Sequence, residues 1–334
     1  MPKVKPVWKP EFLDIWNATL GFYKIWIIHL GRRYGILQAL EETSYSPDKL
    51  ASTLGLQPEP VRIWCDVAYS LGLVQRKKGR YHLSKRLASI LVNENDVNYI
   101  GGLVSYIALR SLDFGVFDDY FKNGASYMPQ PHTTEAFEEA TKWDHTAFMK
   151  LVLPREKRLR TVLENAKVLD LGSGAGNWSI RLASYFKNSE FVCIDTDAAA
   201  IERGKRKSLE LGLKNVTFIL SKAEDVNFEN EFDVIYLGEV LCLMERKEEV
   251  LRVCYSVLKE GGFIIICEGL ISRRNKMRKL EKQILHAMQL DFAVQGARFS
   301  TKDELEHFMA EAGFVKFTFY DAGGGLWFAV ARKG

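Results

Sequence analysis

The stretch Val168-Leu-Asp-Leu-Gly-Ser-Gly-Ala-Gly-Asn-Trp178 decides the fold of this chain. It opens inside a short apolar run, residues 167–171, which predicts a buried strand. Three alternate glycines follow, and an amphipathic helix is expected from Trp178 to Phe186. A glycine-rich turn between a strand and a helix lets the backbone approach a ligand closely and points free N–H groups at it. The stretch therefore predicts binding of an adenosine-containing cofactor.

Strands and helices alternate after this turn. The apolar runs predict strands at 190–195, 216–220, 232–237 and 263–267, with helices at 198–211 and 245–259. Such alternation predicts an α/β fold, with a Rossmann-like, doubly wound parallel sheet that binds ligands at the carboxyl ends of its strands. Asp195 ends the second strand about twenty residues after the glycines, where a carboxylate can accept hydrogen bonds from ribose hydroxyls. Asp197 is the alternative ribose ligand.

The first third of the chain reads as helices followed by a hairpin. Helical patterns cover 22–40, 47–54 and 61–71, and a turn at Lys78-Gly79 lies between two short alternating runs. This is the order of a winged helix-turn-helix, an architecture that DNA-binding proteins use. The candidate recognition helix, 61–71, offers one arginine against one aspartate, whereas reading DNA takes several cationic or amide side chains. We therefore expect residues 1–95 to serve in dimerisation or as a substrate lid, and not to bind nucleic acid.

Length and composition narrow the class of protein. A chain of 334 residues is long enough for two domains, and its net charge of +4 is too small to indicate a nucleic-acid partner. Its five cysteines form no Cys-x-x-Cys pair, which predicts free thiols in a reducing, cytoplasmic compartment and no metal site. The longest apolar stretch near the start, residues 25–30, is far too short to span a membrane.

Residues 96–155 read as a helical linker before the sheet domain, which is expected at 156–334. A long helix is predicted from Thr134 to Lys150, and its aromatic and apolar side chains include Trp143, Phe148 and Met149. Two interpretations stay open for these side chains. They form a helical core stripe, or some of them line a pocket that faces the cofactor.

Four motifs in the same order resemble those of class I S-adenosylmethionine-dependent methyltransferases. They are Asp170–Gly176, the strand-end Asp195, Phe232–Ile235 and Val257–Gly262. The glycines run Gly-x-Gly-x-Gly after Asp-Leu, whereas a nicotinamide-binding fold usually shows Gly-x-Gly-x-x-Gly. The winged-helix start, the helical middle and the segments 288–305 and 312–314 are also similar to the small-molecule O-methyltransferases of plant phenolic and bacterial polyketide metabolism.

The resemblance implies S-adenosyl-L-methionine as cofactor, a small-molecule substrate and an intertwined homodimer built by the amino-terminal domain. It also implies which residues hold the cofactor. They are Asp170, Gly172 and Gly174 for the methionine moiety, Asp195 for the ribose, Lys222, Ala223 and Glu224 for the adenine edge, and Leu237 and Gly238 under the methyl group, with Ser173 and Thr196 in the same loops.

The chain departs from this family where a general base is expected. Many members have a histidine just after the fourth strand, and Cys242 stands at that position here. A thiol with an ordinary pKa of about 8.5 is a poor general base. Lys222 also stands where the adenine motif usually has an acid. Methyl transfer by in-line displacement tolerates the missing base, because positioning can contribute roughly 7–11 kcal/mol, against about 10²–10⁴-fold for a general base.

Four residues are candidates to act on the substrate. Glu239 and Glu268 follow the fourth and fifth strands, where such sheets present active groups, and either can orient a substrate or accept a proton. Glu239 can instead hydrogen-bond the amino group of the cofactor or a loop. His145 supplies the missing base from the preceding helix or is a structural histidine. Cys242 is otherwise a small packing residue.

A hydrophobic pocket for a planar or aromatic ligand is expected beside the cofactor. Its residues are Trp143, Phe148, Met149, Met244, Glu268, Met288 and Phe292. An expected lid, 270–299, adds the apolar positions Met277, Leu280, Ile284 and Leu285 at helical spacing. Its basic run, from Arg273 to Lys282, is either a solvated face or a site for an acidic substrate or a membrane surface.

The sequence thus predicts methyl transfer from S-adenosylmethionine to an O, N or C atom of a small aromatic, quinone-like or polyketide-like molecule. Positioning for in-line displacement carries the reaction, with no clear histidine base. Two alternatives stay open. The missing histidine fits a methyltransferase-like scaffold that performs other chemistry, such as cyclisation or decarboxylation, and the winged helix fits a DNA-binding regulator.

Overall fold

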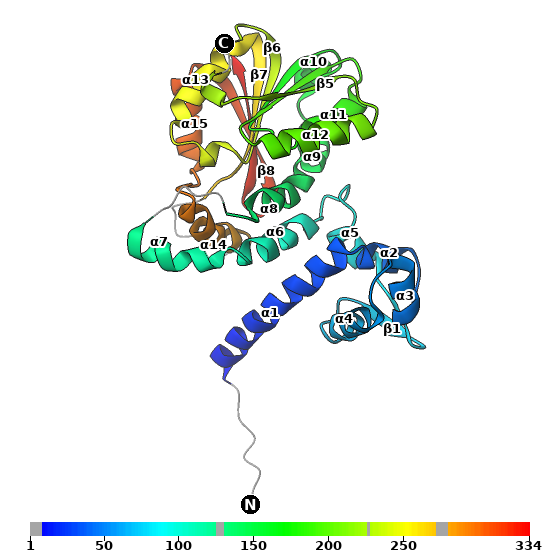
Figure 1. Ribbon diagram of the computed structural model, residues 1–334. Coiled ribbons are helices and arrows are strands. Elements are labelled where there is room, and N and C mark those ends of the chain that lie inside the picture. Colours follow the sequence, from blue (N-terminus) through cyan, green and yellow to red (C-terminus); the bar gives the residue numbers. More distant parts are fainter. Residues whose placement is uncertain (1–8, 125–129, 226–227, 272–279) are drawn as a thin grey trace, which may run out of the picture. The chain divides into compact units, whose positions relative to one another are not determined.

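The structure, a computed structural model, describes most of the chain (Figure 1). Its described residues are 9–124, 130–225, 228–271 and 280–334. Of the expected lid, Met277 and the basic positions from Arg273 to Lys279 lie outside them, as do the side chains of Leu280 and Lys282. Within the described ranges, no helix combines the length and the apolar character that crossing a membrane requires.

The chain divides into two compact units, Met1–Ser111 and Leu112–Gly334. The first is helical apart from one hairpin. Its elements are α1 (Pro10–Arg33), α2 (Ile36–Glu42), α3 (Pro47–Leu54), α4 (Pro58–Ser70), β1 (Gln75–Lys77), β2 (Arg80–His82), α5 (Lys85–Leu91) and α6 (Gly101–Ser111). This unit ends beyond the boundary expected at residue 95, because α6 packs along α1.

Local signals in the sequence place these elements. Prolines in the first turn begin α1, α3 and α4, where a missing N–H loses no helical hydrogen bond. Gly35, with φ 69°, separates α1 from α2, and Lys78 and Gly79 take φ 50° and 74° at the expected hairpin turn. The helices enclose a core that includes Leu37 and Leu40. The predicted order of helices and a hairpin is therefore present, and α1 begins at Pro10 instead of near residue 22.

The second unit begins with short helical segments that lead to the sheet. They are η1 (Phe114–Val116), α7 (Phe117–Asn123), α8 (Thr133–Ala140), η2 (Thr141–Trp143), α9 (Asp144–Ala147), the π-helical η3 (Phe148–Val152) and α10 (Lys157–Val162). The helix predicted from Thr134 to Lys150 corresponds to an uninterrupted helical run, Thr133–Val152, whose type changes from α to 3-10, back to α and then to π. Only Ala136 is buried in α8, whereas every residue of α9 is buried. Wide π-turns of this kind are frequent at functional sites.

A seven-stranded sheet forms the centre of the second unit. Its strands are β3 (Lys167–Leu171), β4 (Glu190–Asp195), β5 (Val216–Leu220), β6 (Phe232–Gly238), β7 (Leu258–Gly269), β8 (Phe314–Gly323) and β9 (Leu326–Lys333). Their order is β5-β4-β3-β6-β7-β9-β8. The first five strands pair in parallel, and β9 runs antiparallel to both of its neighbours. This confirms the predicted doubly wound sheet, to which β8 and β9 add two strands that the sequence did not predict.

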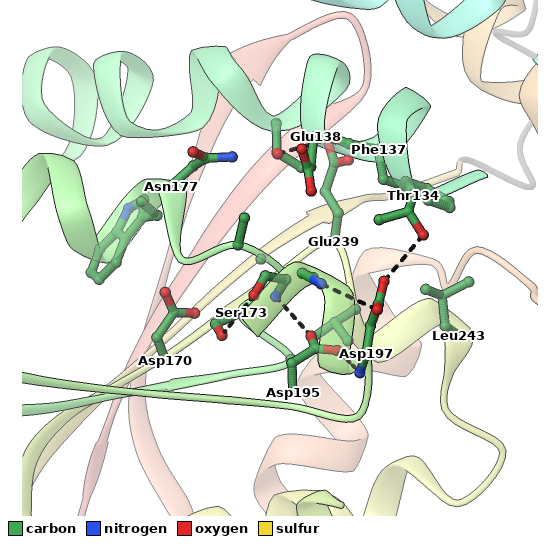
Figure 2. Close-up of a pocket in the computed structure, with 18 of the residues that line it drawn as sticks. Thr134, Phe137, Glu138, Asp170, Ser173, Asn177, Asp195, Asp197, Glu239 and Leu243 are labelled. Atoms are coloured by element: carbon green, nitrogen blue, oxygen red, sulfur yellow. Dashed lines mark hydrogen bonds between the residues drawn. The ribbon is translucent and has the colours of Figure 1, made fainter. Parts of the chain in front are cut away.

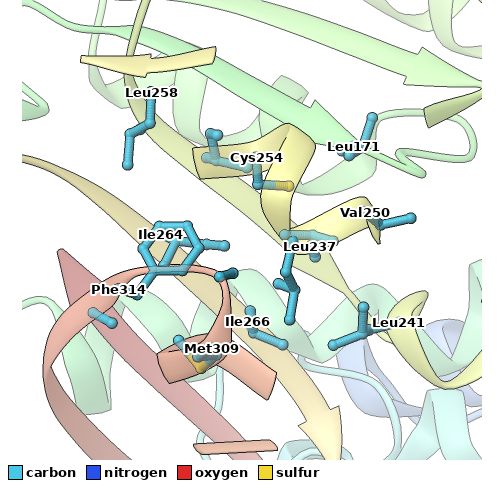
Figure 3. Packing of buried hydrophobic residues seen from close by; sticks show 14 of the residues in the cluster. Leu171, Leu237, Leu241, Val250, Cys254, Leu258, Ile264, Ile266, Met309 and Phe314 are labelled. Carbon is cyan, nitrogen blue, oxygen red and sulfur yellow. The ribbon is translucent and has the colours of Figure 1, made fainter. Parts of the chain in front are cut away.

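Helices cover both faces of this sheet (Figure 1). They are α11 (Asn177–Tyr185), α12 (Ala198–Glu210), α13 (Lys247–Val257) and α15 (Lys302–Glu311), with α10 from the preceding segment, whereas α14 (Leu280–Val294) lies beyond the ends of the strands. Residues of α13 and α15 pack on one face around Leu237, Ile264 and Ile266 (Figure 3). Residues of α10 and α11 pack on the other face with Phe148 and Tyr236. Burial on both faces explains why the strands read as continuous apolar runs.

The strand order reverses between β3 and β6, at the middle of the sheet. The chain leaves β3 toward β4 on one side and leaves β6 toward β7 on the other. In doubly wound sheets the loops that diverge at such a point border a crevice at the carboxyl ends of the strands. The glycine stretch follows β3 and Glu239 follows β6, so both lie beside this crevice.

Candidate functional site

A cavity of about 460 Å³ lies at the crevice (Figure 2). Its walls come from the loops after β3, β4 and β6, from the start of α11 and from α8 and α9. The acidic residues that line it are Glu138, Asp144, Asp170, Asp195, Asp197 and Glu239. Among the described residues that line the cavity there is no lysine or arginine. This charge balance favours a ligand that carries positive charge and hydrogen-bond donors.

The glycine loop forms one wall and depends on its glycines for two different reasons. Gly172, Gly174 and Gly176 take φ of 72°, 54° and 65°, the left-handed region that favours glycine. A Cβ on Gly172 would lie 2.4 Å from a methyl group of Val240, so close packing with the loop after β6 also excludes a side chain there. A Cβ on Gly174 would meet no atom within 4 Å. Gly174 therefore leaves room on the cavity side.

Asp195, at the end of β4, is held by two backbone N–H groups. The N–H of Gly174 donates to Oδ2 at 2.7 Å, and the N–H of Asp197 donates to Oδ1 at 2.8 Å. Each carboxylate oxygen has a second lone pair, which stays available for a hydroxyl donor. Figure 2 shows this carboxylate between the glycine loop and the turn that follows β4. The arrangement suits a vicinal diol, as the sequence predicted for the ribose.

Asp197 caps α12 and connects the loop after β4 to α8. Its Oδ1 accepts hydrogen bonds from the N–H groups of Ala199 and Ala200, and its Oδ2 accepts one from the hydroxyl of Thr134 at 3.3 Å. Oδ1 of Asp197 thus accepts two hydrogen bonds and only Oδ2 keeps a free lone pair, whereas both oxygens of Asp195 keep one. The sequence left Asp195 and Asp197 open as ribose ligands, and this geometry favours Asp195.

Asp170 lies at the bottom of the cavity and is 2 % exposed. Its Oδ2 accepts a hydrogen bond from the hydroxyl of Ser179 at 2.7 Å. Burial, followed by repulsion from Asp195, raises the pKa of this carboxyl to about 7, although the Ser179 bonds act in the opposite direction. A cationic group beside it would favour the ionised form.

Two aromatic rings form a flat wall of the cavity. Trp178 and Tyr236 stack with ring centroids 3.9 Å apart and planes 6° from parallel. The indole N–H of Trp178 and the hydroxyl of Tyr236 are buried; the indole N–H meets no hydrogen-bond partner among the described residues, and the hydroxyl meets only the weakly polar thiol of Cys267. Such atoms are expensive to leave unpaired, so a polar ligand that reaches them would gain from the contact.

Three buried acids lie together near the end of β6 and β7. Glu239 and Glu268 each have a pKa raised to about 7, by burial in both cases and also, for Glu239, by the neighbouring Glu268. Burial and repulsion from Glu239 raise the pKa of Asp144 well above its usual range. Glu239 itself takes φ 53° and its N–H donates to the carbonyl of Cys267 at 2.7 Å. Backbone strain of this kind is concentrated at functional sites.

His145 does not reach the cavity and its environment opposes a role as base. Its Nε2 lies 3.0 Å from the hydroxyl of Thr146, and the side chain is 7 % exposed. Burial, and then the charges of Arg181 and Lys207, lower its pKa to about 4. A group with so low a pKa binds a proton weakly at neutral pH.

Cys242 is a packing residue beside the acids. Its thiol donates to the carbonyl of Glu239 at 3.7 Å, and its backbone N–H donates to Oε1 of Glu268 at 3.1 Å. Burial, with Glu268 and Glu239 nearby, raises the pKa of this thiol well above its usual range. The thiol therefore stays protonated at neutral pH.

The structure brings most of the predicted cofactor residues to one cavity and leaves the others elsewhere. Those that line it are Asp170, Gly172, Ser173, Gly174, Asp195, Thr196, Gly238 and Glu239. Those that do not line it are Lys222, Ala223, Leu237, Cys242, Glu268, Trp143, Phe148, Met149, Met244, Met288 and Phe292. The side chain of Glu224 lies outside the described residues.

The predicted substrate residues that stay outside the cavity pack in the protein. Phe148 is fully buried against Trp178 and Phe328, which corresponds to the core stripe of the two interpretations. Phe292 packs edge-to-face on Phe137, which does line the cavity. Leu237 is buried in the sheet core. Core packing therefore accounts for these apolar side chains.

Sequence reasoning missed several residues of the cavity. They include Thr134, Glu138, Asp144, Asn177, Tyr236, Leu243 and Gln295. Asn177 directly follows the last glycine of the loop, and Tyr236 directly follows the motif Phe232–Ile235. Their positions beside recognised motifs could therefore have identified them. No local pattern marked Asp144, because it stands in an aromatic-rich segment. Which side of that segment faces the cavity depends on the changes of helix type along it. Within the described residues no cluster of histidine, cysteine and acids has the arrangement of a metal site.

Comparison with known sequences agrees with the motifs. The family described as "Methyltransferase domain" matches residues 163–313. The ubiquinone/menaquinone biosynthesis C-methyltransferase of Coxiella burnetii is 34% identical over 114 residues, which are 33% of this chain and 44% of that protein. The carboxy-S-adenosyl-L-methionine synthase of Nautilia profundicola is 30% identical over 116 residues, 34% of this chain and 49% of that protein. The matches thus span less than half of the length of these relatives.

Solved structures share the fold over the whole chain. Human N-acetylserotonin methyltransferase, in complex with S-adenosylmethionine, has a TM-score of 0.73 at 17% identity and covers 100% of both chains. An O-methyltransferase family protein from Burkholderia thailandensis has a TM-score of 0.67 at 15% identity, over 98% of this chain and 99% of that one. At these identities the similarity shows the fold. Residues 163–313 match a methyltransferase domain, and the chain as a whole has the fold of the solved methyltransferases that it resembles.

Proposed function

We propose that this protein transfers the methyl group of S-adenosylmethionine to an O, N or C atom of a small aromatic, quinone-like or polyketide-like molecule. The observation that carries the proposal is the cavity at the switch point, where the glycine loop and the doubly held Asp195 stand opposite Glu239. The cofactor supplies an electrophilic methyl group on a positively charged sulfur. An acidic cavity without lysine or arginine among its described lining residues suits that charge.

The residues present fit the cofactor in three respects. The open space beside Gly174 leaves room for a ligand against the loop. Asp195 offers one free lone pair on each oxygen to a diol. The unpartnered N–H of Trp178 and the hydroxyl of Tyr236 offer hydrogen bonds to further polar atoms. Asp170, buried beneath the loop, can attract the cationic amino group of the methionine moiety.

The acceptor is proposed to lie on the side of the cavity away from Asp195. Phe137 and Leu243 line this cavity together with the stacked Trp178 and Tyr236, and such walls favour a planar apolar molecule. Methyl transfer needs the acceptor in line with the bond that breaks, and a shaped cavity supplies that alignment. A rigid aromatic acceptor loses little conformational freedom there.

The test of this function begins with binding. Isothermal titration of the full chain with S-adenosylmethionine and with S-adenosylhomocysteine should show one site per chain. Incubation with S-adenosylmethionine labelled in its methyl group and a metabolite extract should then transfer label to a small molecule. A chain with the correct circular dichroism that binds neither compound would contradict the proposal.

A second candidate is other chemistry on the same cofactor. It is favoured by the absence of a histidine at Cys242 and by the similarity to a protein named carboxy-S-adenosyl-L-methionine synthase. The labelling experiment separates the two. Tight cofactor binding with no labelled product across the extract would favour this candidate, and a methylated product would remove it.

We also propose that the chain acts as a homodimer in a reducing compartment such as the cytoplasm. The outward side of α1 exposes large apolar side chains, among them Ile15, Trp16 and Phe22, at 69%, 46% and 51%. Contiguous exposed apolar surface of this kind indicates a protein interface. The five cysteines are free and buried, in agreement with a reducing environment. Light scattering after size exclusion should give twice the chain mass, and Ile15→Glu with Phe22→Glu should give the monomer.

A further inference from the structure

Two carboxyl groups at one wall of the cavity lack a cationic partner among the described residues. Asp144 begins α9 and is 2 % exposed, and Glu239 follows β6 and is half-buried. Glu138, by contrast, lines the same cavity and pairs with Arg203 at 2.5 Å. Burying a charge without a partner costs free energy. The carboxyl groups of Asp144 and Glu239 are therefore either protonated or balanced by a cationic ligand.

The two groups interact directly with each other. Repulsion from Glu239 adds to burial in raising the pKa of Asp144. Glu268 repels both, and the Cys267 thiol donates a hydrogen bond to Asp144. Lys247 acts on Glu268 and Cys242. Burial and mutual repulsion both favour protonation of Asp144 and Glu239.

A second observation points to a ligand at the same wall. The hydroxyl of Tyr236 is buried and lacks a hydrogen-bond partner among the described residues, apart from the weakly polar Cys267 thiol beside it. Tyr236 lines the cavity, and its hydroxyl lies so close to Gly238 that a Cβ there would be 2.6 Å from it. After burial, the charges of Asp144 and Glu239 are among the causes that raise the pKa of this hydroxyl. One phenol and two carboxyls, which have no cationic partner among the described residues, therefore line the same cavity.

The backbone of Glu239 supports a functional reason for this arrangement. Glutamate at φ 53° is strained, by roughly 1–3 kcal/mol for such outliers. The strain is maintained by the bond from its N–H to the carbonyl of Cys267 and by the packing of Val240 against Gly172. A glycine would adopt this turn without strain. A glutamate thus stands at a position where the backbone alone would favour glycine.

We propose that Asp144 and Glu239 form a carboxyl pair that shares one proton and accepts the proton of the methyl acceptor, the role that Cys242 cannot fill. The inference rests on the proposed function. The ionised carboxylate of the pair takes the proton of a neutral O–H or N–H group as the new bond to the methyl carbon forms. The bond from that carbon to sulfur breaks at the same time, and its electron pair stays on the now neutral sulfur. The pair then holds two protons and releases one to water.

The pair should reveal itself through protons released on binding. A positively charged sulfur beside the pair favours its ionised form, whereas the neutral sulfur of S-adenosylhomocysteine does not. Titration calorimetry at pH 7 in two buffers of different ionisation enthalpy measures the protons released. S-adenosylmethionine should release about half a proton more than S-adenosylhomocysteine. Glu239→Gln should abolish this difference, and Asp144→Asn should do the same.

Glu138→Gln is the matched control, because it removes a carboxyl of the same cavity whose charge is already balanced by Arg203. It should retain the difference in proton release. Equal release by the two compounds in the unsubstituted protein would overturn the inference, although both bind. Absence of binding by both compounds would instead refute the proposed function. Infrared spectroscopy of the unsubstituted protein should in addition show a protonated carboxyl band that Asp144→Asn removes, and its absence would also overturn the inference.

Discussion

Asp195 and Glu239 lie on opposite sides of the central strand β3, and their carboxylates differ in the hydrogen bonds that the protein donates to them. Asp195 ends β4 and accepts two backbone N–H groups, so its orientation is fixed before any ligand arrives. Glu239 follows β6, and its carboxylate accepts no hydrogen bond from the described residues. The difference teaches that one side of the cavity is built to hold a ligand, whereas the other keeps its reactive groups unpaired.

The largest effect is expected from removing the held carboxylate. Asp195→Ala takes away the acceptor of the Gly174 and Asp197 N–H groups and the proposed partner of the ribose diol. Loss of hydrogen bonds to a charged group costs roughly 1.5–3 kcal/mol, which corresponds to S-adenosylmethionine binding weakened about 10- to 100-fold. Titration calorimetry measures the change.

Asp321→Ala is the matched control for this substitution. Asp321 also accepts a backbone N–H, that of Gly323 at 2.8 Å, but it lies near the end of β8 and does not line the cavity. Its loss should leave cofactor affinity unchanged. Equal affinities of the Asp195→Ala variant and the unsubstituted protein would refute the role given to Asp195.

The second-largest effect is expected where the glycine loop packs against the loop that follows β6. Gly172→Ala introduces a side chain at φ 72° and places its Cβ 2.4 Å from Val240, the neighbour of Glu239. The strain alone costs roughly 1–3 kcal/mol, and the clash adds to it. Gly212→Ala, at φ 67° with no atom within 4 Å of the new Cβ, gives the cost of the backbone conformation without the clash. Urea unfolding should show a greater loss for Gly172→Ala, and equal losses would contradict the close packing.

The held side of the cavity could be predicted from sequence, and the unpaired side only in part. Asp195 follows the glycines within one strand-helix-strand unit, so its place depends on local spacing. Asp144 follows the 3-10 turn η2 (Thr141–Trp143) between α8 and α9, and no local pattern indicates this change of helix type because the segment reads as one aromatic helix. Phe148 fitted a pocket or a core equally well by sequence, and only the π-turn that begins there decides for the core. Packing between residues that are far apart in the sequence thus determines the part of the site that the spacing of motifs could not predict.

A smaller effect is expected in the dependence of stability on pH. The pKa of Glu239 is raised to about 7 in the folded chain, so between pH about 4.5 and 7 the folded state binds more protons than the unfolded state. Its contribution to the free energy of unfolding is therefore fully present at low pH and is lost as the pH rises through 7. Glu239→Gln should raise the melting temperature relative to the unsubstituted protein at pH 8 more than at pH 5. The same difference at both pH values would show that Glu239 ionises freely in the folded protein.

The smallest effect is expected at Cys242, where the sequence resemblance implied a histidine base. Cys242→Ala keeps the backbone N–H that donates to Glu268 and loses the weak contacts of the thiol with the carbonyl of Glu239 and with the carboxyl of Glu268. Stability should fall by about 1 kcal/mol, the cost of a small buried group. Affinity for S-adenosylmethionine should change by less than about twofold, since 0.4 kcal/mol or so is all that such a contact supplies. A tenfold loss of affinity, or of methyl transfer at unchanged affinity, would mean that the thiol itself acts on the ligand.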